Sequence, residues 1–300
     1  MKRIVITLAL SAFTGCACAQ NNAPVIKKGL YVNRSSASHD GEGIPVHVVI
    51  TSASQKFVEI QNADGSWGAN GNRQLPSAFC LISLLRQGES RESEKFGRAI
   101  VASHTWLMDS HPGTDPERVA TAIALSDYIT VHYRWDAPDE KTEVPAAQIQ
   151  KIRDCVKAIS PQCDEMWRDL LSLSRLPAEI GRGRDGSTIR GTLDKYLDRE
   201  LEGSPSTLDA YLLLHLCSSA RFHRGGKNWS DWNRQFSPML VRTQEAGGLF
   251  PCKPPEDRIA ATGLSVMSLT IYNSISPNFS AKAWPVTGKS EDVGIKVDVK

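Results

Sequence analysis

The feature that most constrains the fold of this chain is an apolar pattern of helical period that recurs about every 44 residues. Apolar residues return at intervals of three and four positions in segment after segment, whereas alternating strand patterns are scarce. A hydroxyl or acidic residue followed by an apolar core marks five positions: Ser77, Thr121, Glu165, Asp209 and Thr262. The first four are 44 positions apart, and the last step is 53. The repeat predicts one helix pair per unit and five units in all.

The periodic segments predict about ten helices. Several starts carry a capping residue at or before a proline suited to the first helical turn, as in Thr114-Asp115-Pro116, Ser160-Pro161 and Ser204-Pro205. The expected helices span residues 46–61, 75–87, 91–109, 116–133, 146–158, 162–174, 188–202, 206–222, 229–244 and 257–275.

Repeats of this length are typical of stacked helical hairpins, because one hairpin cannot bury its own apolar face. The second helix of each pair is the more apolar, as Tyr211 to Cys217 and Ile259 to Tyr272 illustrate. We therefore expect an all-α protein with an inner ring of buried helices and an outer ring of half-exposed ones. The alternative is an open solenoid of the HEAT or TPR type, although neither signature occurs in register.

The first 19 residues have the pattern of a secretory signal peptide. Lys2 and Arg3 precede a short apolar run from Ile4 to Phe13, and small residues end at Ala17-Cys18-Ala19. A membrane anchor would need an apolar run of about 20 residues. Cys16, within Thr14-Gly15-Cys16, offers the alternative of a lipoprotein signal. We expect an exported protein, periplasmic or secreted.

Composition shifts divide the rest of the chain. Residues 20–43 and 281–300 are polar, lack a periodic apolar pattern and are expected to be a flexible lead-in and a C-terminal tail. The helical domain is expected to span residues 44–280. No later apolar run approaches the length that a transmembrane helix requires, so we expect none.

The charge pattern argues against nucleic acid as a partner. The formal net charge is only +2, and the basic residues are scattered along the chain. We expect instead a small molecule, a carbohydrate or a protein of the cell envelope.

Five of the seven cysteines remain once Cys16 and Cys18 leave with the signal peptide. Cys155 and Cys163 lie eight positions apart across an expected helix turn and could form a disulfide; isolated buried thiols are the alternative. No C-x-x-C or H-x-x-x-H pair occurs, and we expect neither a metal nor another cofactor.

A family resemblance is carried by two turns. The segment from Gln61 to Gly68 reads QNADGSWG and resembles the Q-x-x-D-G-S-W motif of terpenoid cyclases and protein prenyltransferases. The segment from Gln244 to Phe250, QEAGGLF, is similar to a degraded copy, and each segment precedes an expected inner helix. The resemblance implies an α/α toroid of the squalene-cyclase-like group, with two concentric rings of helices around a central cavity.

The motif residues Gln61, Asp64, Gly65 and Trp67 are expected to hold the fold rather than to catalyse. The glycine allows a tight turn, the glutamine can cap a neighbouring helix end, and the tryptophan packs over the joint.

The functional motifs of the similar families are missing. The Asp-x-Asp-Asp motif that protonates the substrate of class II cyclases does not occur, and Cys163-Asp164-Glu165 lacks its spacing. Asp154-Cys155 supplies at most two of the three ligand types of the prenyltransferase zinc site. Cys80 is not part of the thioester motif found in complement-like toroids. We therefore expect no terpene cyclase activity.

Polar residues at the starts of the inner helices are the candidate site. An acid/base pair for glycoside cleavage could come from Asp115, Glu165, Asp209 and Asp257. Arg118, Asp209 and Arg258 are candidates for binding a sugar or an acidic ligand at one mouth of the cavity. The alternative is that the acids cap helices and the arginines pair with them at the surface.

The segment from Trp229 to Trp232 could be a platform on which a sugar stacks, or it could simply pack an amphipathic outer helix. Three functions remain open at this point: a binding module, an enzyme (a cyclase, or a carbohydrate lyase or hydrolase using paired carboxylates), and a structural module of an envelope assembly. An interior filled by Phe79, Trp167 and Tyr211 would favour the last.

Overall fold

The part of the chain that the computed structural model describes, residues 45–69, 71–135, 144–174, 176, 186–200 and 203–271, folds into ten α-helices without a β-strand. The expected all-α class is confirmed. The segments 1–19, 20–43 and 281–300 lie outside the described residues. The helices are α2 (Val46–Ile60), α3 (Gln74–Arg86), α4 (Gly97–Asp109), α5 (Asp115–Ile129), α6 (Ala146–Lys157), α7 (Glu165–Leu173), α8 (Gly186–Leu197), α9 (Leu208–Arg224), α10 (Gly226–Thr243) and α11 (Arg258–Leu269).

Most helix boundaries lie close to those expected from the sequence, and the main error is before α4. The predicted helix 91–109 begins only at Gly97, because Ser90 and Ser93 form a turn. The backbone N–H of Ser93 donates to the Ser90 carbonyl at 3.0 Å, and the Ser93 hydroxyl accepts from the N–H of Ser90 at 2.8 Å. A Cβ at Gly97 would lie 2.4 Å from the carbonyl oxygen of Arg91, so this turn folds back closely against the first residue of α4.

Other helix ends differ in detail. The predicted helix 188–202 ends at Leu197, and the predicted helix 229–244 begins at Gly226. The predicted helix 116–133 continues beyond Ile129 as a π-helix over Thr130–Trp135. The predicted helix 257–275 is preceded by a 3-10 turn at Pro255–Asp257, and residues 272–275 lie outside the described residues.

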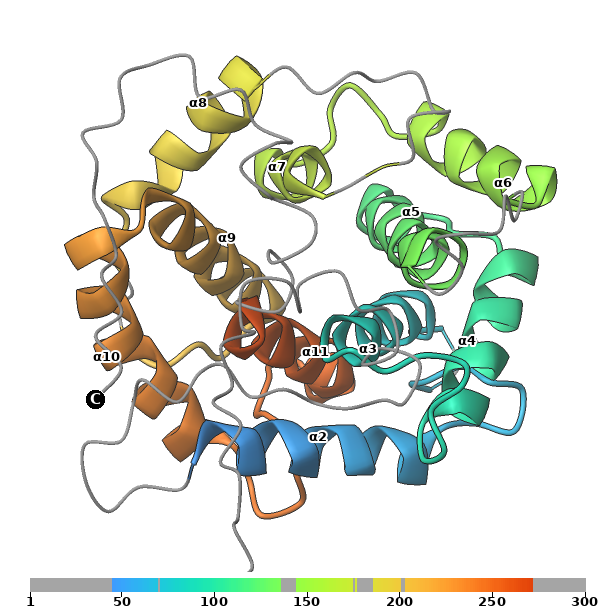
Figure 1. Ribbon diagram of the computed structural model, residues 1–300, viewed down its shortest axis with the longest axis horizontal. Coiled ribbons are helices and arrows are strands. Elements are labelled where there is room, and N and C mark those ends of the chain that lie inside the picture. Colours follow the sequence, from blue (N-terminus) through green and yellow to red (C-terminus); the bar gives the residue numbers. More distant parts are fainter. Residues whose placement is uncertain are drawn as a thin grey trace, which may run out of the picture.

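The helices form two concentric layers (Figure 1). Along the inner layer α3 packs against α5, α5 against α7, α7 against α9, α9 against α11, and α11 against α3. Because the first and last inner helices touch, the order is closed, which an open stack of hairpins would not allow. The helices α2, α4, α6, α8 and α10 lie outside and pack on the inner ones.

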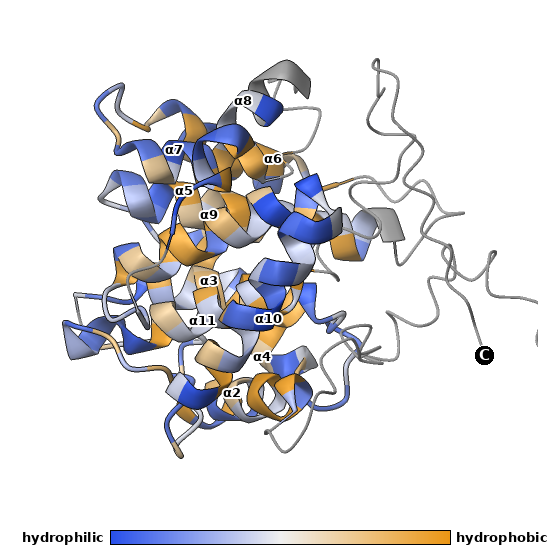
Figure 2. Ribbon diagram, turned by 90° about the vertical axis from the view of Figure 1, so that its left-hand side faces the viewer, coloured by the Kyte–Doolittle hydropathy of each residue, from blue (hydrophilic) through white to orange (hydrophobic). Residues whose placement is uncertain are grey.

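Burial follows the two layers. On α5 every residue from Val119 to Ile129 is buried, whereas the outer helix α10 buries one face through Trp229, Trp232, Phe236, Ser237 and Leu240. Figure 2 shows the hydrophilic surface of α10 next to the apolar α9. A helix that is apolar all round is stable only when neighbours cover it on every side.

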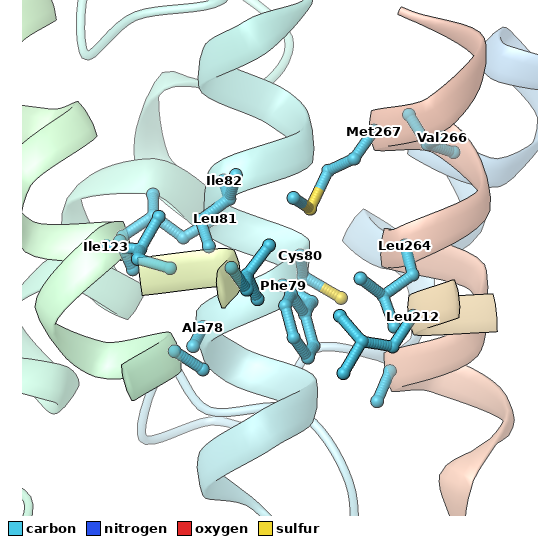
Figure 3. Packing of buried hydrophobic residues seen from close by; sticks show 14 of the residues in the cluster. Ala78, Phe79, Cys80, Leu81, Ile82, Ile123, Leu212, Leu264, Val266 and Met267 are labelled. Carbon is cyan, nitrogen blue, oxygen red and sulfur yellow. The ribbon is translucent and has the colours of Figure 1, made fainter. Parts of the chain in front are cut away.

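Side chains from different inner helices meet inside the inner layer. Phe79 of α3 and Trp167 of α7 have ring centroids 6.0 Å apart, although α5 lies between their helices in the ring order. Figure 3 shows Phe79 together with Leu212 of α9 and Leu264 of α11. Gly263 makes this packing possible, because a Cβ there would lie 2.7 Å from Cβ of Phe79.

The turn after α2, from the motif identified in the sequence, joins three helices. The side-chain amide of Gln61 donates to the carbonyl of Gly65 at 2.9 Å and to that of Ala99, in α4, at 3.0 Å. The backbone N–H of Trp67 donates to the Ser77 hydroxyl of α3 at 2.8 Å. The Trp67 side chain is fully buried.

Asp64 and Gly65 shape the turn itself. Asp64 accepts from the N–H and the hydroxyl of Ser66 at 3.0 and 2.7 Å, and these bonds, with Arg73, lower the pKa of its carboxyl group. Gly65 has φ of 90°, and a Cβ would lie 2.5 Å from the Ala102 carbonyl oxygen. Both the conformation and the space require glycine.

The turn after α10 has the same hydrogen bonds, although only its glutamine and glycine match the motif. The Gln244 amide donates to the carbonyls of Gly248 and Val49, each at 2.9 Å. The N–H of Phe250 donates to the Thr262 hydroxyl at 2.9 Å, as Trp67 does to its serine. The shared geometry makes the two turns structural copies of each other.

The neighbouring helix end that Gln61 contacts is the start of α4, since Ala99 lies in its first turn. Gln244 likewise contacts Val49 in the first turn of α2. The carbonyls that accept are therefore not the unpaired ones of a helix C-terminus. Each glutamine links the end of one outer helix to the start of the next.

Candidate functional site

The inner helices begin at a common end of the molecule, where the sequence placed its candidate site. The side chain of Asn72, before α3, donates to Asp257 before α11 at 2.8 Å. The N–H of Lys253 donates to the carbonyl of Ser206, before α9, at 2.8 Å. These contacts join loops that lead into different inner helices.

Asp115 and Arg118 are bound to each other at the start of α5. Arg118 donates from Nη1 to Asp115 at 2.8 Å and from Nη2 to the Gly113 carbonyl at 2.9 Å. Asp115 also accepts from the N–H of Ser160 at 3.1 Å, which ties α5 to the loop before α7. Thr114 and Glu117 complete a capping box at this start.

The other three candidate acids lie at separate helix starts. Glu165 pairs with Lys195 at 2.6 Å on the surface, and this bond lowers the pKa of its carboxyl group. A general acid in glycoside cleavage needs the opposite shift. Asp209 is exposed in the first turn of α9, and Asp257 holds Asn72. Arg258 forms an ion pair with Glu245 across the turn after α10.

These contacts match capping and surface pairing, which was the alternative to a ligand-binding ring. The acid/base role of the four carboxylates stays a prediction.

All five cysteines of the described chain are free and buried, so the possible Cys155–Cys163 disulfide is absent. Burial raises the pKa of each thiol: Cys80, Cys155, Cys163, Cys217 and Cys252. Such thiols are poor nucleophiles. Among the described residues no three His, Cys, Asp or Glu side chains gather as metal ligands would.

A polar layer crosses the inner helices near their C-terminal halves. It occupies the position six residues after each repeat position. The layer consists of Ser83, Asp127, Leu171, His215 and Ser268, all of them buried. Four of the five are polar, which is unusual for a helix interior. Sequence reasoning missed this layer, although aligning the inner helices by their repeat would have revealed it.

The polar members of the layer have different partners: Asp127 pairs with Arg86, His215 with Ser268, and the Ser83 hydroxyl donates to the Cys80 carbonyl. Arg86, at the end of α3, donates from Nε to Asp127 of α5 at 2.9 Å, and both side chains are largely buried. The Ser268 hydroxyl donates to the Leu264 carbonyl at 2.9 Å, so its oxygen accepts from Nδ1 of His215 at 3.2 Å. This geometry assigns the Nδ1–H tautomer to His215.

His215 is held neutral. Burial, and next the nearby Arg86 guanidinium, lowers the pKa of its imidazole to about 3. A neutral histidine bonded to a serine needs no counter-ion, which suits a buried position between α9 and α11. The charged and polar side chains Asp127 and His215 thus each have a partner inside the protein.

One buried carboxyl has a raised pKa. Glu89, in the turn after α3, is 7% exposed, and burial raises its pKa against the opposing effect of a hydrogen bond with Ser93. Nothing in the local sequence of this polar turn marks Glu89 as a buried residue.

Trp229 and Trp232, near the start of α10, are buried against neighbouring side chains rather than exposed to solvent. The Trp232 indole N–H donates to the Ser218 hydroxyl at 2.9 Å, and the Arg221 guanidinium lies 4.0 Å from the centre of its ring. Trp229 packs against Phe236 with centroids 5.8 Å apart. These contacts support packing over a sugar platform.

A groove lies beside these tryptophans, between the end of α8 and α10. Its volume is about 600 Å³. It is lined by Leu197, Asp198, Glu200, Gly203, Arg221, Asn228, Asp231, Trp232, Gln235, Phe236 and Met239.

No protein-family model, curated protein or solved structure matches this chain. The resemblance to terpenoid cyclases thus stays a prediction from the two turn motifs and the helical repeat. In the described part of the chain, no helix has both the length and the apolar character needed to cross a membrane.

Proposed function

We propose that this protein is an exported module of the squalene-cyclase-like α/α-toroid type that binds a partner or ligand and does not perform terpene chemistry. The contact between Phe79 and Trp167, 6.0 Å between ring centroids, carries the proposal. Cyclisation of a long hydrocarbon needs an apolar cavity large enough to enclose it. Phe79 and Trp167 meet where such a cavity would have to open, which favours contacts at the outer surface, such as a structural module of an envelope assembly would also make.

The polar layer supports the same conclusion. Its polar members have partners within the fold, as Asp127 has Arg86 and His215 has Ser268. Groups that bind or protonate a substrate instead face a pocket that the substrate can enter. These residues serve the interior packing.

The enzyme alternative, a cyclase or a carbohydrate lyase or hydrolase, gains little support. Its acids would have to be poised with a raised pKa near a cavity. Glu165 has a lowered pKa, and Asp115 and Asp257 hold helix starts together. Glu89, the acid with the raised pKa, follows α3 rather than lying among the candidate carboxylates.

Site-directed photo-crosslinking in the cells that express the protein tests the proposal. A crosslinking amino acid is placed at exposed positions around the outer ring, such as Val48, Val101 and Gln235. We expect adducts with a defined envelope component from one face only. The purified protein is incubated in parallel with squalene, geranylgeranyl diphosphate and cell-wall polysaccharide. Turnover of any of these would overturn the proposal, as would the absence of adducts from every outer face.

A further inference from the structure

The groove between α8 and α10 has an excess of negative charge. Three carboxylates line it, from Asp198, Glu200 and Asp231, against the single cation Arg221. Asp198 and Glu200 directly follow the C-terminus of α8, where the helix dipole adds negative potential. The field inside the groove therefore favours a cation.

Arg221 keeps its positive charge, but bonds to backbone carbonyls hold its guanidinium at the end of α8, so the lining carries three negative charges against one positive charge. It donates from Nη1 to the Tyr196 carbonyl at 2.9 Å and from Nη2 to the Arg199 carbonyl at 2.8 Å. Its plane lies over the Trp232 ring. These bonds hold the Arg221 guanidinium against the C-terminal end of α8.

The pairing of Asp231 is weak as well. Asp231 forms an ion pair with Arg234 at 3.6 Å, and the Arg234 side chain is 74% exposed. Exposed pairs of this kind contribute little energy. Asp231 is available to a cation that enters the groove.

The remaining walls suit a long, flexible cationic side chain attached to a peptide. Leu197, Phe236 and Met239 offer apolar surface along which the methylene groups of lysine or arginine can lie. Asn228 and Gln235 offer side-chain amides, which can bond to peptide groups. A sugar would need an open aromatic face, and the Trp232 face toward Arg221 is covered.

We propose that this groove binds a lysine- or arginine-containing segment of a partner protein, whose cationic head group lies among Asp198, Glu200 and Asp231. This proposal rests on the proposed function, since it gives the partner of the binding module its chemistry. The methylene stem of the side chain lies along Phe236 and Met239, and the peptide backbone bonds to the amides of α10.

The test uses the purified full chain and a fluorescein-labelled tetralysine peptide, followed by fluorescence anisotropy, with tetraglutamate as the control peptide. We expect saturable binding of tetralysine only, weakening as the ionic strength rises from about 20 to about 200 mM, because salt screens exposed charges. Equal binding of both peptides, or none of tetralysine, overturns the groove proposal.

The groove variant D198N/E200Q/D231N should bind tetralysine at least about tenfold more weakly, since three attractive charges are removed. Gln235→Lys provides an independent variant, in which a tethered cation competes for the groove, and it should also weaken binding. Thermal melts show whether each variant folds. If one variant does not fold, the other still tests the groove.

The matched control also removes three negative charges, but from exposed acids on the opposite side of the ring. Glu92, Glu94 and Asp109 belong to α4 and the turn before it, across the molecule from α10 (Figure 1). E92Q/E94Q/D109N should leave binding within about twofold of the unmodified chain, because those acids lie beyond the screening length from the groove. Equal loss in both triple variants would show general charge attraction and overturn the proposal.

Cellular crosslinks distinguish this proposal from the proposed function. Adducts from Val48 or Val101 without any from Gln235 would keep the binding module and reject the groove.

Discussion

Gln244 and Val49 are 195 residues apart in the sequence, yet the side-chain amide of one donates to the backbone carbonyl of the other at 2.9 Å. The bond joins the end of α10 to the first turn of α2, the last and first outer helices of the described chain. Gln61 makes the equivalent bond from α2 to α4. Hydrogen bonds from two matching turns thus link three consecutive outer helices.

Gln244→Ala should lower the free energy of unfolding by about 1–2 kcal/mol, because two part-buried carbonyls lose their donor. Urea unfolding measures the loss, and hydrogen exchange should show faster opening of α2. Gln235→Ala, an exposed change on α10, should have no effect on either measurement. An unchanged midpoint for Gln244→Ala would mean that the ring closes without this bond.

Gly263→Ala should destabilise the protein by about 1–3 kcal/mol, because overpacking forces well-packed neighbours apart. The added methyl group would meet Cβ of Phe79 at 2.7 Å and the Phe79 backbone at 2.9 Å. Gly191→Ala is the matched control, since a Cβ there meets nothing within 4 Å, and alanine in that helix should be neutral or stabilising. In thermal melts, Gly263→Ala should therefore lower the melting temperature, whereas Gly191→Ala should leave it unchanged or raise it.

Arg86→Met should cost about 3 kcal/mol, because it leaves the Asp127 carboxylate buried without its cation. Asp127→Leu should cost a similar amount for the converse reason. The double variant R86M/D127L should recover a large part of the loss, as apolar replacements of buried pairs often do. Additive losses in this cycle, measured by urea unfolding, would show that the two residues do not interact.

Stability should fall as the pH drops from about 6.5 to about 3, partly through His215. Its pKa is lowered from 6.5 to about 3 in the folded protein, so the unfolded state takes up a proton first. The stabilisation is complete above pH 6.5 and is lost as the pH falls toward 3, by at most about 1.4 kcal/mol per pH unit.

Urea unfolding at several pH values checks this expectation. His215→Gln should flatten the pH dependence, whereas His111→Gln, in the exposed loop after α4, should leave it unchanged. His104 and His223, whose pKa values burial lowers to about 4, should account for part of the remaining slope. The same slope in His215→Gln as in the unmodified chain would contradict the assignment.

How far the sequence predicts this protein depends on how local each feature is. The helix starting at Asp115 was expected from Thr114 and Pro116, and the structure shows the capping box there. Caps, turns and helical periods arise from residues three or four positions apart, so one sequence carries the whole interaction. The repeat of 44 residues likewise showed which helix of each pair is buried.

The candidate site depended on contacts that no local pattern carries. Asp115, Glu165 and Asp257 stood out because they begin helices, and the structure engages them in holding those starts. Arg86 and Asp127 did not stand out, because they are 41 residues apart in the sequence and only the folded chain brings them into contact.

The sequence by itself determined the helices, their order, and which of them must be buried. The tertiary structure decided that α11 returns to α3 over Gly263, that Arg86 reaches Asp127, and that three acidic residues line one groove with Trp232. The physical reason is the range of the interactions. A helix is stabilised by bonds within one turn, whereas a closed ring, a buried ion pair and a groove depend on where all the helices lie at once.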